Sequence, residues 1–298
     1  MAGLSFTVTP SDNSDRHMPT YQSTPQFEHG LPESLGVLLV NLGTPDAPTA
    51  SAVRRYLRQF LWDPRVVEIP RPLWWLILNL VILPFRPATS AKAYAEIWTD
   101  EGSPLLLHSQ DIADSVARQL AGRVSGVVNV ELGMSYGSPS IDQALDKLFS
   151  EGAQRIVCLP LYPQYSGTTT GSVFDDVARS LGRRRWVPEF RFIGQYHDAR
   201  GYIAAQVQNI REYWDQHGRG EKLLFSFHGL PKQTLENGDP YHCQCLKTAR
   251  LIAESLELED GSWQVTFQSR LGRAEWLKPY TSDVVTELGN AGLSRIDV

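Results

Sequence analysis

Short apolar runs that alternate with amphipathic helical segments constrain the fold of this 298-residue chain more than any other feature. The runs are rich in branched side chains, as is typical of strands buried on both faces of a sheet. Between them, apolar residues recur at helical spacing, as Val53, Tyr56, Leu57, Phe60 and Leu61 do. This alternation predicts an α/β protein in which helices cover parallel strands. The candidate strands span 36–40, 127–132, 155–161, 190–193, 223–227, 264–268 and 295–298.

Three of the later helical segments have well-defined inner faces. Ser140 precedes the first of them as a cap, and Gln143 follows three residues later, as in a capping box. The other two helices are predicted over 200–215 and 244–256. The expected inner faces are Ile141, Ala144, Leu145, Leu148 and Phe149 in the first helix, Ile203, Val207, Ile210 and Trp214 in the second, and Leu246, Ala249, Ile252 and Leu256 in the third.

The number of strands exceeds one compact sheet unit, which predicts two doubly wound parallel-sheet domains. Polarity rises at 182–185, where a glycine is followed by three arginines, and this rise marks the expected boundary. The predicted division is a leader at 1–33, an N-terminal domain at 34–183 and a C-terminal domain at 184–298. The leader is expected to be disordered because it is polar and lacks the apolar core of a signal peptide.

Composition narrows the class of protein further. The net charge of -5 and the pI of about 5.8 leave no basic stripe for nucleic acid. The three cysteines, Cys158, Cys243 and Cys245, are too few for a disulfide framework and favour a reducing compartment. The chain is therefore predicted to be cytoplasmic.

One segment, residues 73–85, is strongly apolar. Its 13 residues fall short of the roughly 20 that a membrane span needs. Flanking prolines are expected to end a helix on either side of it. Two interpretations stay open: a buried helix, or a patch at the mouth of a cleft that touches the inner face of the membrane. If the second holds, replacing Trp74 and Ile77 with Ser is expected to weaken liposome binding without unfolding the protein. The flanking prolines are Pro70, Pro72, Pro84 and Pro87.

Ligands of doubly wound domains bind beyond the carboxyl ends of the strands, so the loops there are the candidates for a site. The loop at 41–45 lacks a dinucleotide fingerprint and alone indicates a turn. The loop at 159–172 is rich in hydroxyls and glycines, which suit an anion site or a capped helix start. His228 ends a predicted strand, where catalytic groups stand, although a lone histidine is also often structural. The loop at 267–277 holds an arginine and a tryptophan, which suit either a site or an ordinary turn over the core.

Taken together and in this order, these loops resemble those of ferrochelatases, the enzymes that end protohaem synthesis. The resemblance covers about residues 35–298. It implies two similar Rossmann-like domains of the chelatase type with a cleft between them. The matching stretches are VNLGTP at 40–45, EGSPL at 101–105, YPQYSGTTTGS at 162–172, SFHGLP at 226–231, GDPY at 238–241 and FQSRLG at 267–272.

The resemblance also implies roles for particular residues. His228 matches the family's active-site histidine, viewed as a metal ligand, as the base for the pyrrole protons, or as both. A neutral imidazole suits both tasks, because it accepts protons near neutral pH and binds iron(II). Leu42 matches a residue over the porphyrin face and cannot itself ligate a metal. The positions that match those lining the macrocycle or its propionates are Arg86, Ser135, Tyr136, Tyr162 and Trp276.

The implied function is that of a lyase in haem biosynthesis. It would insert Fe(II) into protoporphyrin IX, so that its partners are the porphyrin and ferrous iron. Two alternatives stay open. One is a non-catalytic porphyrin-binding protein or truncated inactive chelatase, and the other is a chelatase for a different tetrapyrrole or metal.

Two departures from the family's pattern matter. Several members hold an iron–sulfur cluster through a cysteine beside YPQYS, where this chain has Gly167, and three thiols fall short of the four that a cluster needs. No cofactor is therefore expected, with iron serving only as substrate. The sequence also ends in a predicted strand at 295–298, whereas the family continues with a loop that carries a catalytic glutamate. The chain is accordingly expected to lack that segment and to be a fragment or a poor catalyst.

Overall fold

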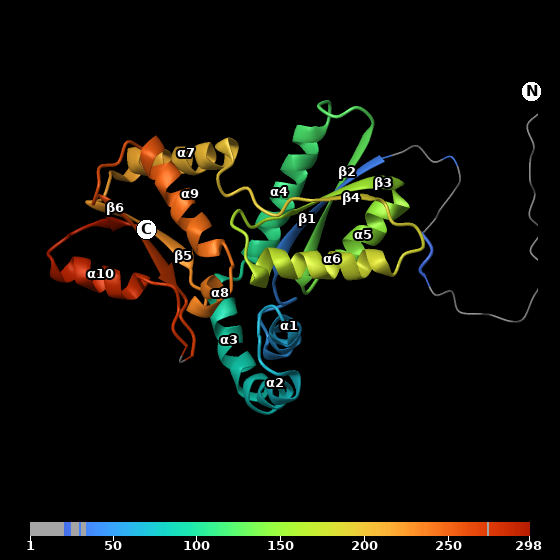
Figure 1. Ribbon diagram of the computed structural model, residues 1–298, viewed down its shortest axis with the longest axis horizontal. Helices are drawn as coiled ribbons and strands as arrows, with labels where there is room; N and C mark the ends of the chain where they lie inside the picture. The colour runs from blue at the N-terminus through green and yellow to red at the C-terminus, as the bar shows by residue number, and fades with distance from the viewer. Residues whose placement is uncertain (1–20, 25–29, 31–33, 273) are drawn as a thin grey trace, which may run out of the picture.

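The computed structural model describes residues 21–24, 30, 34–272 and 274–298. In this part of the chain, helices flank two separate parallel sheets (Figure 1). The leader predicted at 1–33 lies almost wholly outside the described residues.

The N-terminal sheet has the strand order β2-β1-β3-β4, and the C-terminal sheet has the order β6-β5-β7. Every pair of neighbouring strands in these sheets is parallel, which confirms the predicted α/β class. Each strand expected from the apolar runs is present. Their bounds are Ser34–Gly43 (β1), Val127–Tyr136 (β2), Ala153–Pro160 (β3), Glu189–Phe192 (β4), Lys222–His228 (β5), Trp263–Gln268 (β6) and Ile296–Asp297 (β7).

Strand β4 bears on where the two domains meet. It follows the boundary predicted at 183–184, yet it pairs with β3, with Phe190 opposite Ile156. By sheet pairing, the N-terminal unit therefore extends through Phe192. The division of the chain into domains otherwise stays a prediction.

The helices fall into two groups that follow the sheets. The first group is α1 (Ala50–Trp62), α2 (Arg71–Ile77), the π-helix η1 (Leu78–Ile82), α3 (Leu83–Ile97), α4 (Pro104–Leu120), α5 (Ile141–Ser150), the π-helix η2 (Gly167–Gly171) and α6 (Ser172–Gly182). The second group is α7 (Arg200–His217), α8 (Lys232–Glu236), α9 (Tyr241–Ser255) and α10 (Thr281–Asn290).

Helices cover both faces of the N-terminal sheet. Side chains of β1 alternate between the two faces, as strand geometry requires. Leu38 and Val40 pack on the face covered by α5 and α6, whereas Val37 and Leu39 pack on the face covered by α4. The whole predicted inner face of α5 is buried in the first of these clusters, and the capping box forms. In it, the Ser140 hydroxyl accepts from the Gln143 N–H at 3.2 Å, and Gln143 Oε1 accepts from the Ser140 N–H at 2.8 Å.

In the C-terminal unit, α7 and α9 lie side by side over one face of the sheet, and α10 lies on the other (Figure 1). Ile252 of α9 and Leu256, which caps it, are buried as predicted, but Leu246 is 42% exposed. Cys245 takes the inner position instead, because the buried face of α9 steps from 245 to 249, 252 and 256. The prediction for Leu246 was wrong by one residue, or about 100° around the helix.

The expectation that prolines end the helix around residues 73–85 is wrong at its carboxyl side. The segments α2, η1 and α3 form one continuous helix, Arg71–Ile97, which runs through Pro84 and Pro87. A π-turn precedes Pro84, where the Leu83 N–H donates to the Leu78 carbonyl oxygen. This change of hydrogen-bond register puts Pro84 in a first-turn position, where its missing N–H costs little. By length and composition alone, this helix is long and apolar enough to cross a membrane.

Candidate functional site

His228 and Trp276 are brought together at the carboxyl ends of β5 and β6. The two rings lie 6.5 Å apart and are tilted by 54°. Gly229 makes this approach possible, since a Cβ there would lie 2.8 Å from the Gln268 carbonyl oxygen and 3.2 Å from Trp276 Cε3. Its N–H donates to the same Gln268 oxygen at 2.7 Å. The turn after His228 therefore requires glycine, because any side chain there would clash with Gln268 and Trp276.

The hydrogen bond of His228 determines which ring nitrogen is free. Nδ1 lies 2.7 Å from the Gly229 carbonyl oxygen, which can only accept, so the neutral ring carries its proton on Nδ1. Nε2 then keeps its lone pair. The side chain is exposed at the end of β5. This nitrogen is thus available to accept a proton or to bind a metal ion.

Leu42 and Tyr136 lie at the matching edge of the N-terminal sheet. Gly43, beside Leu42, stands opposite Tyr136 in the β1–β2 register. Leu42 is partly buried and packs on the cluster that contains Tyr136 and Tyr56. The ring of Tyr136 contacts Phe60 edge-on, with centroids 5.2 Å apart.

The hydroxyl of Tyr136 is already engaged. It donates to Asp63 Oδ2 at 2.7 Å and lies 3.0 Å from the Ser172 hydroxyl, which also bonds Asp63. Burial raises the pKa of Tyr136 well above its ordinary value. Sequence reasoning missed Asp63, whose only signal was an acid directly after the first amphipathic helix. Tyr136 is also only 5% exposed, so its ring is part of the core beside Leu42.

Tyr162 follows β3 and packs against the cluster between β1, α5 and α6. Its hydroxyl and that of Ser135 are both buried and face each other, and neither has another partner among the described residues. Burial raises the pKa of Tyr162 above its ordinary value.

Arg86 lies on α3, in the helical segment rather than at a strand end, and its side chain is exposed. No ion pair to it is found within the described residues. The structure thus groups His228 with Trp276 and Leu42 with Tyr136, while Arg86 stands apart on its own helix. The assignment of these residues to a porphyrin site stays a prediction.

The described residues contain no cluster of three or more His, Cys, Asp or Glu side chains suited to a metal ion. Cys158 and Cys245 are buried, and Cys243 is exposed. Cys158 is a small core residue of β3, as expected. The prediction that the chain carries no iron–sulfur cluster stays a prediction.

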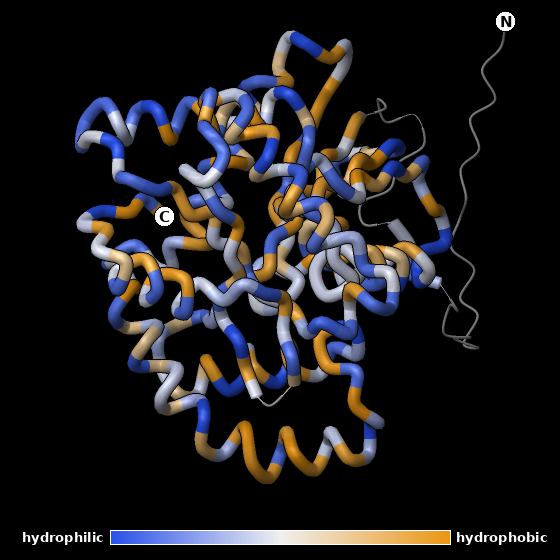
Figure 2. The backbone as a smooth tube through the Cα atoms, turned by 60° about the vertical axis from the view of Figure 1, so that its left-hand side comes forward, coloured by the Kyte–Doolittle hydropathy of each residue, from blue (hydrophilic) through white to orange (hydrophobic). Residues whose placement is uncertain are grey.

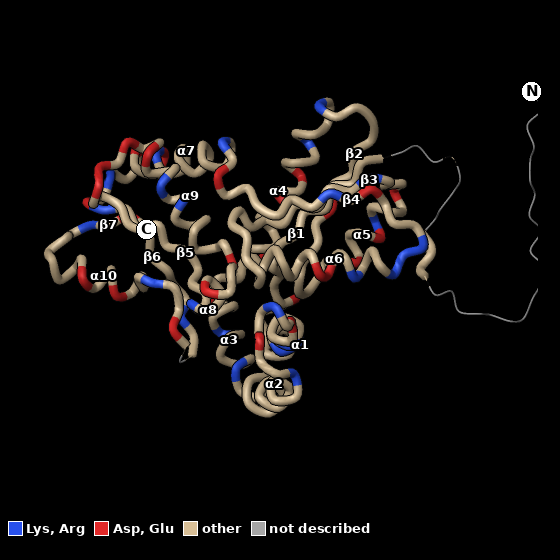
Figure 3. The backbone as a smooth tube through the Cα atoms, in the orientation of Figure 1, with Lys and Arg blue, Asp and Glu red and all other residues tan. Residues whose placement is uncertain are grey.

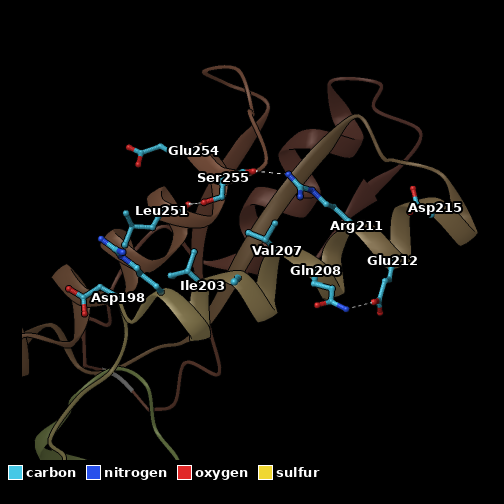
Figure 4. Close-up of a pocket in the computed structure, with 12 residues that line it drawn as sticks. Asp198, Ile203, Val207, Gln208, Arg211, Glu212, Asp215, Leu251, Glu254 and Ser255 are labelled. Carbon is cyan, nitrogen blue, oxygen red and sulfur yellow. Dashed lines mark hydrogen bonds between the residues drawn. The ribbon is translucent and has the colours of Figure 1, made fainter.

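A groove of about 670 Å³ runs between α7 and α9, on the face of those helices turned away from the sheet (Figure 4). Ile203, Val207 and Leu251 form its apolar floor, and Arg211 donates to the Ser255 carbonyl oxygen at 2.9 Å. Its described lining holds no histidine, cysteine or aromatic side chain. The groove therefore lacks the imidazole and thiolate ligands that iron(II) favours and the aromatic rings that would stack on a flat ring, and its carboxylates form no metal-binding cluster among the described residues.

Comparison with known proteins gives a consistent result along nearly the whole chain. A family model described as Ferrochelatase matches residues 34–298. The ferrochelatase of Thioalkalivibrio sulfidiphilus is 60% identical over 272 residues, which are 91% of this chain and 74% of that protein. The ferrochelatase of Nitrosococcus oceani is 56% identical over the same shares of both chains. Among solved structures, SirB from Bacillus subtilis with Fe3+ aligns with 86% of this chain and 71% of its own, at 13% identity and a TM-score of 0.47. On the match of the family model and the identity to these relatives, the chain belongs to the ferrochelatase family.

Proposed function

We propose that His228 takes up the pyrrole protons and captures the metal when this chain inserts ferrous iron into protoporphyrin IX to form protohaem. The observation that carries the proposal is the bond from Nδ1 to the Gly229 carbonyl oxygen, which leaves Nε2 with a free lone pair. A porphyrin must lose two protons as the metal enters, and an imidazole can accept a proton and then release it to solvent. The exposure of His228 at a strand end keeps that nitrogen within reach of a ligand.

The neighbouring side chains suit a flat, apolar macrocycle with carboxylates at its edge. We propose that Leu42, Tyr162 and Trp276 contact its faces, since aromatic and aliphatic walls suit such a ring. Tyr136 would support Leu42 from behind, because its ring is buried and Asp63 holds its hydroxyl. Arg86, without an ion pair among the described residues, would meet a propionate.

Anaerobic turnover with protoporphyrin and ferrous iron tests the function. We expect the protohaem absorption spectrum to appear with time and in proportion to the protein. A protein that only binds porphyrin would give an immediate spectral shift with no further change. A chelatase for another tetrapyrrole would leave protoporphyrin metal-free.

We also propose that the helix Arg71–Ile97 rests on the inner face of the membrane by one side. Its other side packs on the N-terminal domain, where Trp74 is only 6% exposed and donates from Nε1 to the Leu61 carbonyl oxygen at 2.6 Å. On the free side, Leu80 is 61% and Phe85 73% exposed. Figure 2 shows this helix at the lower edge of the molecule, coloured mostly as hydrophobic. A helix already packed along one side suits lying on a bilayer better than crossing it.

Charge supports the same orientation. Between Glu68 and Glu96 the sequence contains no acidic residue, but it contains Arg71, Arg86 and Lys92. Figure 3 shows basic positions and few acidic ones on α2 and the start of α3. Basic residues beside an apolar face favour the anionic lipids of an inner leaflet. The protein would then be cytoplasmic and peripheral to that leaflet.

Replacing the exposed residues Leu76, Leu80 and Phe85 together with Ser is expected to lower binding to anionic liposomes by about tenfold or more, because apolar contact with lipid is lost. The melting temperature should change little. Leu246→Ser, at an exposed leucine on α9, is the matched control and should bind as the parent does. Trp74 is unsuitable for this test, contrary to the choice made from the sequence, because it is buried. If the triple variant bound liposomes as strongly as the parent, the membrane proposal would be wrong.

A further inference from the structure

The GDPY segment that precedes α9 holds the hydroxyl-rich loop of the N-terminal unit by a side-chain carboxylate. Asp239 Oδ2 accepts from the Gly167 N–H at 2.7 Å and from the Ser166 hydroxyl at 3.1 Å. Asp239 Oδ1 accepts from the Tyr241 N–H at 3.0 Å. One carboxylate therefore joins a backbone amide of the first unit to the start of a helix in the second.

Two further bonds join the same loop to α9. The Tyr165 N–H donates to Gln244 Oε1 at 2.7 Å, and Gln164 Nε2 donates to Thr248 Oγ1 at 3.0 Å. Gln164, Gln244 and Thr248 are all buried. Water cannot replace these bonds, because the amides and hydroxyls are buried and would be left without partners. The bonds therefore favour one relative placement of the two units.

The bonded residues follow a regular order. On the α9 side, Gln244 and Thr248 are about one helical turn apart and so lie on one face, whereas Asp239 precedes the helix. On the loop side, the partners at 167, 165 and 164 run in the opposite direction along the chain. A displacement of one unit relative to the other would break all three contacts together. The contacts thus act as a register between the units, which we call the loop latch (Gln164, Tyr165, Ser166 and Gly167 with Asp239, Gln244 and Thr248).

We infer that Asp239 and Gln244 are positioning residues that set the distance between the Tyr162 wall and His228. Tyr162 lies two residues before the latched loop, and His228 lies on the unit that carries Asp239 and Gln244. Neither Asp239 nor Gln244 needs to touch a ligand for this role. This inference rests on the proposed function, because the distance matters only if the two units hold one substrate between them.

Asp239→Ala tests the inference, with Asp297→Ala as the matched control. Asp297 also accepts two hydrogen bonds at 2.7 Å, from the Gly220 N–H and from Trp214 Nε1, but both partners lie within the C-terminal unit. We expect Asp239→Ala to lower kcat for metal insertion by about ten- to hundredfold, as small misplacements of reacting groups do, with KM for iron nearly unchanged. Asp297→Ala should lower the melting temperature yet keep kcat within about twofold. Asp239→Asn keeps one acceptor oxygen for the Gly167 N–H and should recover part of kcat.

A second measurement does not depend on activity. Amide hydrogen exchange at residues 162–171 should quicken in Asp239→Ala and stay at the parent's rate in Asp297→Ala, because only the first loses the latch. An active parent whose Asp239→Ala variant keeps both its kcat and its exchange rates would overturn the inference. Equal loss of kcat in both variants would also overturn it, since the effect would then be one of stability. A parent that inserts no metal counts against the function instead, and the exchange data then decide whether the latch exists.

Discussion

His228→Ala is expected to lower the rate of metal insertion by about 10²-fold or more, which is typical of a lost general base. The physical reason is the loss of Nε2, the nitrogen left free by the bond from Nδ1 to the Gly229 carbonyl oxygen. Porphyrin affinity should change little, because one imidazole contributes little of the area that contacts the macrocycle. Stopped-flow formation of protohaem gives the rate, and fluorescence quenching of the porphyrin gives the affinity.

His217→Ala is the matched control. His217 is also exposed, but it ends α7 at the opposite edge of the sheet from His228, where its ring stacks on Tyr213 at 4.4 Å. Its replacement should leave both rate and affinity unchanged. Near-normal turnover by His228→Ala would mean that another group takes the protons, and the assignment of His228 would fail.

Gly43→Ala is expected to destabilise the fold by about 3 kcal/mol or more, among the larger effects of a single methyl group. Gly43 has a φ of +100°, and a Cβ there would lie 1.7 Å from the Tyr136 carbonyl oxygen. That contact is impossible, so β1 and β2 would have to separate where Leu42 and Tyr136 meet. For a unit of this size the melting temperature should fall by roughly 6–12 °C.

Gly126→Ala separates this clash from the cost of the backbone conformation. Its φ is +97°, but no atom lies within 4 Å of the position that a Cβ would take. We expect a loss of only about 1 kcal/mol, the cost of a left-handed conformation for alanine. If Gly43→Ala and Gly126→Ala lowered the melting temperature by the same amount, the steric explanation for Gly43 would be wrong.

Local patterns in the sequence were sufficient for most of the fold. The apolar runs gave the strands, and helical spacing gave the inner face of α5, because both depend on neighbours along the chain. The errors arose where distant or unusual geometry intervenes. A π-turn carried the helix past Pro84, and the start of α9 set its phase so that Cys245 faces inward in place of Leu246.

The site was partly predictable for the same reason. His228 stands at a strand end, and the bond that orients its ring goes to the next residue, so the sequence contained both. The role of Asp63 could not be read in this way, since its partners Tyr136 and Ser172 come 73 and 109 residues later. The loop latch is equally non-local, because it joins residues 72 to 84 positions apart.

The ribosome makes the apolar helix Arg71–Ile97 before some of the residues on which it packs. Its inner side packs on α1, which precedes it, and on Tyr136, which is made about 50 residues after Phe85. At roughly 5–20 residues per second, synthesis leaves that interval open for about 3–10 s. Strand β1 also has no partner until β2 and β3 have emerged. On the proposed membrane contact, the nascent chain would expose its most apolar segment to lipid seconds before the sheet beneath it can assemble, so lipid contact would precede folding.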